Sequence, residues 1–145
     1  EERWFEALLD RKDDYLYAIE VQVNKQWVHI GNVGLHGIDW RNRSAHFAIV
    51  IGEKESWSRG YGSDAARTML RFAFETLKME RVEFRADLKN ARSIAAMKSI
   101  GCIEEGVLRS NMSLPDNRRR DSIVLSILKD EWFNTVKEEL KKKIY

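Results

Sequence analysis

The chain has little cysteine and little proline, since Cys102 and Pro115 are the only residues of their kinds. A single cysteine excludes an internal disulfide framework and fits a reducing compartment, so we expect a cytoplasmic protein. Long apolar runs are also lacking, because none approaches the roughly 20 residues of a membrane-spanning helix. The first residues do not follow the pattern of a signal peptide. We therefore expect no membrane partner.

An excess of charge of one sign is lacking too. The 25 lysines and arginines nearly balance the 23 aspartates and glutamates, which leaves a net charge of +2. Dedicated nucleic-acid-binding domains are far more basic, so we expect no nucleic-acid partner. What the chain does contain is 43% hydrophobic and 33% charged residues over a length of 145, which suits a globular domain with its own core. We expect a single domain over residues 1–145.

Apolar periodicity predicts a sheet with helices packed on it. Residues 1–12 repeat apolar side chains at spacings of three and four, which predicts an amphipathic helix. Residues 47–51 are all apolar, which predicts a strand buried on both faces. The predicted order is helix 1–12, strands 15–23, 27–40 and 45–52, helix 63–78, strand 81–88, helix 90–100, strands 102–114 and 120–129, and an amphipathic C-terminal helix 130–145. The short links between the first three strands predict an antiparallel meander. The fold class is therefore α/β (α+β), with a mixed, mostly antiparallel sheet and helices on both faces.

The stretch Trp57–Ser63 places two glycines, Gly60 and Gly62, at the start of a predicted helix. A helix start leaves backbone N–H groups unpaired at the positive end of the helix dipole, and this geometry binds phosphate. A tight loop without a ligand is the alternative. A Walker loop is excluded, because it ends in Gly-Lys-Ser/Thr and here serine and aspartate follow Gly62. Residues 60–65 match the dinucleotide fingerprint G-x-G-x-x-A. Two features count against a dinucleotide-binding fold: residues 53–59 separate the match from the preceding strand, and only one β-α-β crossover is available.

The same stretch resembles the signature of the GNAT superfamily of N-acetyltransferases, Q/R-x-x-G-x-G/A. Trp57 occupies the Gln/Arg position, and Gly60-Tyr61-Gly62 carries the glycines. Large hydrophobic residues at the first position are familiar in the RimJ/RimL-like branch, which modifies protein N-termini. Three further segments look like that branch's strand 5, helix 4 and strand 6, namely residues 81–87, 90–94 and 104–109. The resemblance extends over residues 15–132 and implies a GNAT-like acyl-CoA N-acyltransferase fold.

The resemblance implies acetyl-CoA as the acetyl donor, and no metal. The third strand would lie beside the pantetheine arm, and the glycine loop would hold the pyrophosphate. The donor-binding residues implied are Ile49, Val50, Ile51, Ser58, Arg59, Gly60, Tyr61, Gly62, Ser63, Asn90 and Ser93. Asn90 is equally well explained as a plain helix N-cap. The family's usual first strand and helix are missing here, which would leave residues 15–23 as an unprotected edge strand. The chain is then either a fragment or is completed by a partner, such as a second copy in a homodimer.

Catalysis in this family is a direct attack of a neutral amine on the thioester. His46 is the first candidate general base, because an imidazole with a pKa of about 6.5 suits an α-amine at neutral pH. Glu83, which matches the strand-5 glutamate of other members, is the second candidate. Either side chain could instead be structural, His46 as a packed ring and Glu83 as a salt-bridge partner. Met97 stands where many members have the tyrosine that protonates the leaving thiolate, so water would supply that proton. We interpret Cys102 as a core residue.

The resemblance predicts an acetyl-CoA-dependent N-acetyltransferase that acts on a primary amine, either a protein or peptide N-terminus or a small molecule. The alternative is a non-catalytic acyl-CoA-binding or regulatory domain, which Met97 and the missing first elements favour. The run Arg118-Arg119-Arg120 lies in the last predicted hairpin, which borders the acceptor site in this family. It is either a solvated turn or a surface that attracts an acidic acceptor.

Overall fold

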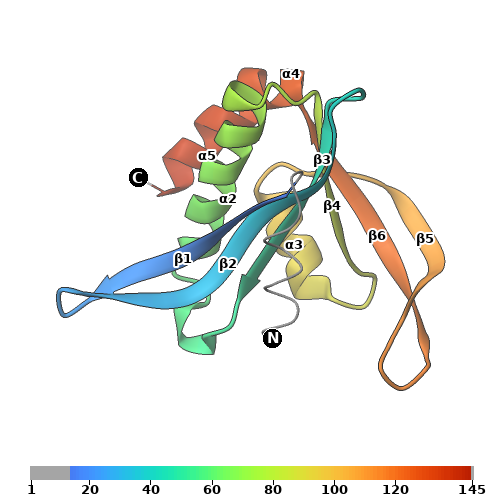
Figure 1. The fold of residues 1–145 in the computed structure, drawn as a ribbon, viewed down its shortest axis with the longest axis horizontal. Helices are drawn as coiled ribbons and strands as arrows, with labels where there is room; N and C mark the ends of the chain where they lie inside the picture. Colours follow the sequence, from blue (N-terminus) through green and yellow to red (C-terminus); the bar gives the residue numbers. More distant parts are fainter. Residues whose placement is uncertain (1–13, 145) are drawn as a thin grey trace.

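The computed structural model describes residues 14–144, which contain a six-stranded sheet with the strand order β1-β2-β3-β4-β6-β5 (Figure 1). The strands are β1 Tyr15–Val23, β2 Gln26–Asp39, β3 Ser44–Ile51, β4 Arg81–Asp87, β5 Ile103–Ser113 and β6 Arg119–Leu128. The helical segments are η1 Lys54–Ser56, α2 Tyr61–Arg71, η2 Phe72–Thr76, α3 Ala91–Ser99, α4 Lys129–Glu131, η3 Trp132–Val136 and α5 Lys137–Ile144. The element order from the first strand onward confirms the sequence-based prediction. The helix predicted over residues 1–12 lies outside the described residues.

The sheet is mixed, and its one parallel pair positions the site. β1, β2 and β3 form the predicted antiparallel meander, and β1 is an edge strand among the described residues. Helix α2 then crosses over to β4, which pairs with β3 in parallel. β6 pairs antiparallel with both β4 and β5. The mixed, mostly antiparallel sheet expected from the sequence is therefore confirmed.

The hydrophobic core lies between one face of the sheet and the helices. Leu35 and Leu125 on the sheet and Leu70 and Phe74 on the helices are fully buried. The rings of Phe74 and Trp132 stack at 5.8 Å and tie α2–η2 to the C-terminal helix. Burying each such side chain contributes about 1.5–3 kcal/mol, so this contact fixes the helices against the sheet. Among residues 14–144, no helix combines the length and apolar character that a membrane span requires.

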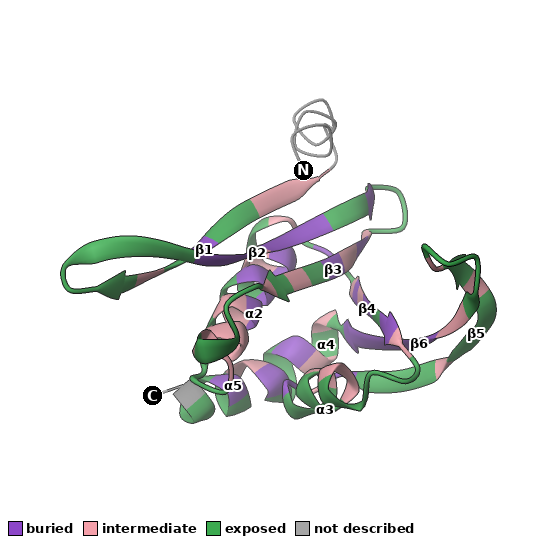
Figure 2. Cartoon of the chain, turned by 90° about the horizontal axis from the view of Figure 1, so that it is seen from below, coloured by how far each residue is buried: buried purple, intermediate pink, exposed green. Residues whose placement is uncertain are grey.

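Two expectations about β3 and the following helix are corrected by the structure. β3 is buried on one face only, because Phe47 is buried whereas Val50 is 66% exposed. The physical reason is that α2, α3 and α5 all lie on the same side of β1–β3 (Figure 2). Helix α2 starts at Tyr61, two residues before the predicted start, because Gly60 in a left-handed conformation serves as its N-cap.

Candidate active site

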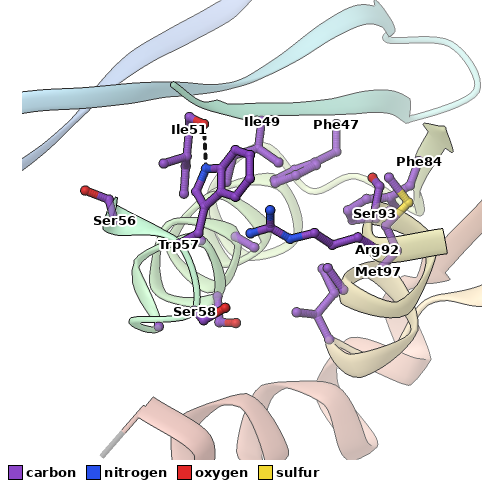
Figure 3. A pocket seen from close by; sticks show the side chains of 16 residues that line it. Phe47, Ile49, Ile51, Ser56, Trp57, Ser58, Phe84, Arg92, Ser93 and Met97 are labelled. Atoms are coloured by element: carbon purple, nitrogen blue, oxygen red, sulfur yellow. Dashed lines mark hydrogen bonds between the residues drawn. The ribbon is translucent and has the colours of Figure 1, made fainter. Parts of the chain in front are cut away.

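The parallel pair of strands β3 and β4 separates after three residues. Ser44–His46 pairs with Arg81–Glu83, but no pairing between the two strands follows, although β3 continues to Ile51 and β4 to Asp87. A cavity of about 400 Å³ opens where the strands part (Figure 3), and we call it the donor cavity because the resemblance implies the acetyl donor at its lining residues. It is lined by Phe47, Ile49, Ile51, Ser56, Trp57, Ser58, Gly60, Gly62, Ser63, Ala66, Phe84, Arg92, Ser93, Ala96, Met97 and Ile100.

The edge of β3 that faces the donor cavity carries backbone groups that β4 does not pair. The N–H of Gly52 donates to Ile30 on β2, so by strand alternation the N–H and C=O groups of Ile51 and Ile49 point the other way, into the split. The indole Nε1 of Trp57 donates to the Ile51 carbonyl at 2.9 Å. Ile49 and Ile51 therefore line the cavity as expected from the sequence. Val50 does not, because its backbone faces β2 and its side chain faces solvent.

The glycine turn places the start of α2 at the donor cavity. Gly60 has φ +84° and ψ −9°, a conformation that residues with a Cβ rarely adopt, and it caps α2 without a side-chain hydrogen bond. The N–H of Asp64 makes the first helical bond, to the carbonyl of Gly60. The N–H groups of Tyr61, Gly62 and Ser63 come before it and have no acceptor within the helix. These three groups could hold a phosphate at the mouth of the cavity.

Of the six predicted loop residues, four line the donor cavity: Ser58, Gly60, Gly62 and Ser63. Arg59 is exposed beside it. The Tyr61 side chain points elsewhere and lines a separate cavity of about 480 Å³ between α2 and β1. The structure thus gives Tyr61 a backbone position at the loop but no side chain in the donor cavity.

Helix α3 forms the opposite wall of the donor cavity. Asn90 Oδ1 accepts a hydrogen bond from the Ser93 N–H at 3.1 Å, so Asn90 caps α3 and its side chain does not line the cavity. Ser93 and Met97 do line it. The sequence prediction missed Arg92, whose guanidinium lies 3.7 Å from the ring centroid of Trp57 (Figure 3). Helical spacing could have indicated Arg92, because it lies one turn before Ala96, another residue of α3 that lines the donor cavity.

A second cavity of about 240 Å³ lies on the other side of the split, and we call it the acceptor cavity because the two candidate bases, His46 and Glu83, line it. It is lined by His36, His46, Phe47, Ala48, Ile49, Glu83, Arg85, Ser93 and Met97. Phe47, Ile49, Ser93 and Met97 belong to both cavities, so the two meet between the separating strands. The register brings the predicted pair His46 and Glu83 together as the last partners of β3 and β4.

The acceptor cavity contains a carboxylate held by two arginines. Glu83 accepts from Arg81 Nη2 at 2.9 Å and from Arg85 Nε at 2.7 Å, and His46 Nδ1 lies 3.5 Å from its Oε1. Desolvation raises the pKa of Glu83, but the hydrogen bonds from Arg81 and Arg85 outweigh it, and the pKa is lowered overall. His36, which the sequence prediction missed, stacks on His46 with ring centroids 5.4 Å apart. Glu83 is therefore an ionised, bonded carboxylate beside an imidazole.

The other candidate groups take no part in this arrangement. Cys102 is buried, and burial raises the pKa of its thiol, in keeping with the core role inferred from the sequence. Among residues 14–144, no three His, Cys, Asp or Glu side chains form a group that could hold a metal ion. Arg118 pairs with Asp116, and Arg119 donates to Ser110 and Ser113 within the same hairpin.

Comparison with known proteins identifies the family. The family model of the acetyltransferase (GNAT) domain matches residues 1–103. Over 102 residues the chain is 34% identical to the "Putative ribosomal N-acetyltransferase YdaF" of Bacillus subtilis (strain 168), and the match covers 70% of this chain and 55% of that protein. The chain spans about half the length of the curated relatives it matches.

Solved structures agree with this assignment. The structure of a "putative acetyltransferase" from T. thermophilus is 33% identical, with a TM-score of 0.84 over 97% of this chain and 72% of that one. The spermidine/spermine N-acetyltransferase SpeG from Vibrio cholerae has a TM-score of 0.76 over 92% of this chain and 75% of that one, and at 22% identity it shows the fold alone. With its split sheet, its glycine-capped helix and these matches, the chain belongs to the acetyltransferase (GNAT) domain family.

Proposed function

We propose that the chain is an acetyl-CoA-dependent N-acetyltransferase that transfers the acetyl group directly to a primary amine. The observation that carries the proposal is the meeting of two cavities in the split between β3 and β4. One has helix-start N–H groups that could hold a phosphate and a free strand edge, and the other has an imidazole beside a carboxylate. A donor thioester and an acceptor amine that enter from opposite sides would meet at Phe47, Ile49, Ser93 and Met97.

On the donor side, the backbone does most of the binding. The first-turn N–H groups of α2 would hold the pyrophosphate, with Arg59 as an additional cation. The free groups of Ile49 and Ile51 would pair with the pantetheine amides as an added strand does. Because the indole of Trp57 already donates to the Ile51 carbonyl, pantetheine would replace that bond. The largely apolar lining of the cavity suits the pantetheine arm.

On the acceptor side, we propose His46 as the general base and Glu83 as the group that orients it. A carboxylate bound by two arginines is a poor base, whereas the imidazole 3.5 Å away can accept the amine proton. The amine nitrogen forms a bond to the carbonyl carbon, the carbon–sulfur bond breaks, and the proton passes to His46. The thiolate is a tolerable leaving group because a thiol has a pKa of about 8.5. Met97 has no proton to give, so water would protonate the thiolate.

For the acceptor we propose the RimJ/RimL-like assignment, with a protein or peptide N-terminus as the substrate. The name of the B. subtilis relative and the large residue Trp57 in the signature support it. We also propose a cytoplasmic location, which the single cysteine supports. A second copy of the chain remains our proposal for covering the β1 edge.

Thermal unfolding and thiol release test the proposal together. Acetyl-CoA at about 100 times its Kd should add about 2.7 kcal/mol of stability, which is a rise of about 5–10 °C in Tm. Free thiol should then appear with peptides that have unblocked N-termini, and not with N-acetylated controls. His46→Ala should lower kcat and remove the ionisation of the base from the pH profile, whereas Glu83→Ala should lower kcat with that ionisation retained.

A second candidate function is a non-catalytic acyl-CoA-binding domain, which Met97 in place of the usual tyrosine favours. Binding of acetyl-CoA without turnover on any peptide or small amine would support the non-catalytic function and refute the enzyme proposal. Absence of any acetyl-CoA binding would contradict both.

A further inference from the structure

Within the part of the chain that the structure describes, the lining of the acceptor cavity offers no unpaired carboxylate to attract a cation. Among its lining residues within positions 14–144, Glu83 is the only carboxylate and Arg85 the only guanidinium. Both oxygens of Glu83 already accept hydrogen bonds, one from Arg81 and one from Arg85. The carboxylate is therefore already paired within the protein, and Arg85 is the charged lining residue that still has unused donors.

The terminal nitrogens of Arg85 remain available as hydrogen-bond donors, whereas those of Arg81 are in use. Arg81 uses both terminal nitrogens, with Nη1 and Nη2 donating to Glu105 and Nη2 also to Glu83. Arg85 uses only Nε, which donates to Glu83 at 2.7 Å, and its two terminal amino groups donate to no group within the described part of the chain. The Arg85 side chain is 43% exposed, so these donors face an open cavity. A guanidinium fixed at one end with two parallel N–H donors outward is the fork that binds a carboxylate.

The distance between His46 and the outer nitrogens of Arg85 defines how far apart the amine and the carboxylate of a substrate must lie. Glu83 and Arg85 are two residues apart on β4, a rise of about 7 Å, and the Nε–Glu83 bond draws the guanidinium back toward the carboxylate. His46 lies beside the same carboxylate. An amine at His46 and a carboxylate at Arg85 would thus be separated by a few bonds, as in an α-amino acid or an N-terminal aspartate or glutamate.

We propose that the acceptor is a primary amine with a carboxylate a few bonds away, and that Arg85 binds this carboxylate. The inference rests on the proposed acetyltransferase function and narrows its substrate class. Polyamines fit poorly, because a second ammonium group would meet Arg85 and a Glu83 that is already neutralised. The likeness to a spermidine/spermine acetyltransferase, at 22% identity, shows the fold alone and carries no argument for a polyamine acceptor.

Acceptor pairs that differ in one charge test the inference. Alanine against alaninamide varies the α-carboxylate, and two amidated peptides that begin with glutamate or glutamine vary the side-chain carboxylate. We expect the acid member of one pair to be favoured about 10- to 100-fold in kcat/KM, the range of one charge-assisted hydrogen bond. Preference in the first pair identifies a free amino acid, and preference in the second identifies an acidic peptide N-terminus. Equal use of both members in both pairs, or a preference for spermidine, would overturn the inference.

Variants at Arg85 separate substrate recognition from a structural role. Arg85→Gln should bring the acid-to-neutral ratio close to one, and Arg85→Lys, which keeps the charge but loses the fork, should give an intermediate ratio. Arg41→Gln, a matched control in the exposed turn after β2, should keep the wild-type ratio. With CoA present to hold the donor side, calorimetry should show that Arg85→Gln weakens binding of the favoured acid. If Arg85→Gln slows both members alike and leaves the ratio unchanged, Arg85 is structural and the inference is wrong.

The controls also distinguish failure of this inference from failure of the proposed function. Turnover on neutral amines with no acid preference refutes the role of Arg85 and leaves the acetyltransferase proposal standing. Absence of turnover with every acceptor, in a chain that acetyl-CoA does not stabilise, refutes the acetyltransferase proposal, and the substrate class is refuted with it.

Discussion

The same substitution, glycine to alanine, should have opposite effects at the two glycines of the donor loop. Gly60 has φ +84°, and a Cβ built there would meet no atom within 4 Å, so the cost is conformational only and amounts to about 1–2 kcal/mol. Gly62 lies inside α2, and a Cβ there would rest 3.4 Å from Ile51 Cδ1, an ordinary contact. Alanine in a helix is favoured over glycine by about 0.5–1 kcal/mol.

Thermal unfolding followed by circular dichroism measures both effects. In a chain of 145 residues, 1 kcal/mol corresponds to about 2–4 °C, so Gly60→Ala should lower Tm by about 2–8 °C and Gly62→Ala should raise it by about 1–4 °C. Gly62→Ala keeps its backbone N–H and should still be stabilised by acetyl-CoA. A Gly60→Ala variant as stable as the wild type would refute the left-handed cap, and with it the argument that places the first-turn N–H groups at the cavity.

Three further substitutions test other parts of the structure. Gly101→Ala should cost about 2–4 kcal/mol in urea unfolding, because φ is +101° and the new Cβ would lie 2.8 Å from Val136 Cγ2; a loss below about 1 kcal/mol would contradict the close packing. The pKa of Glu83 is lowered on folding, so its contribution to stability is present above the unfolded pKa of about 4.3 and is lost as pH falls through the folded value. The stability difference between wild type and Glu83→Gln should therefore shrink between about pH 6 and pH 3, and a constant difference would contradict the ion pairs. Asn90→Ala should cost about 1 kcal/mol and Asn90→Asp much less, because the cap accepts from the Ser93 N–H; equal losses would argue against capping.

Local structure was predictable because it depends on neighbouring residues. The strict alternation of residues 81–87, the turn chemistry between the first strands and the capping asparagine before α3 all act within a few positions, and each element formed where expected. Burial was less predictable. The apolar run in β3 predicted burial on both faces, but only its inner face meets helices in the described residues.

The site depended on long-range registers that local patterns do not encode. His36 was missed because its importance comes from pairing opposite His46 across the β2–β3 ladder. Arg92 was missed because its partner Trp57 is 35 positions away and meets it only across the donor cavity. The sequence offered Glu83 either as the second candidate base or as a salt-bridge partner, and only the structure shows that it contacts both Arg81 and Arg85.

The sequence by itself determined the order of the elements, the presence of a glycine turn before the second helix and the resemblance to acetyltransferases, because periodicity and short motifs are local properties. Only the tertiary structure decided that β3 and β4 part after His46 and Glu83, since hydrogen-bond register between distant strands follows from packing of the whole sheet. That separation creates the two cavities and brings the imidazole to the carboxylate, beside which the outer nitrogens of Arg85 keep no acceptor among the described residues.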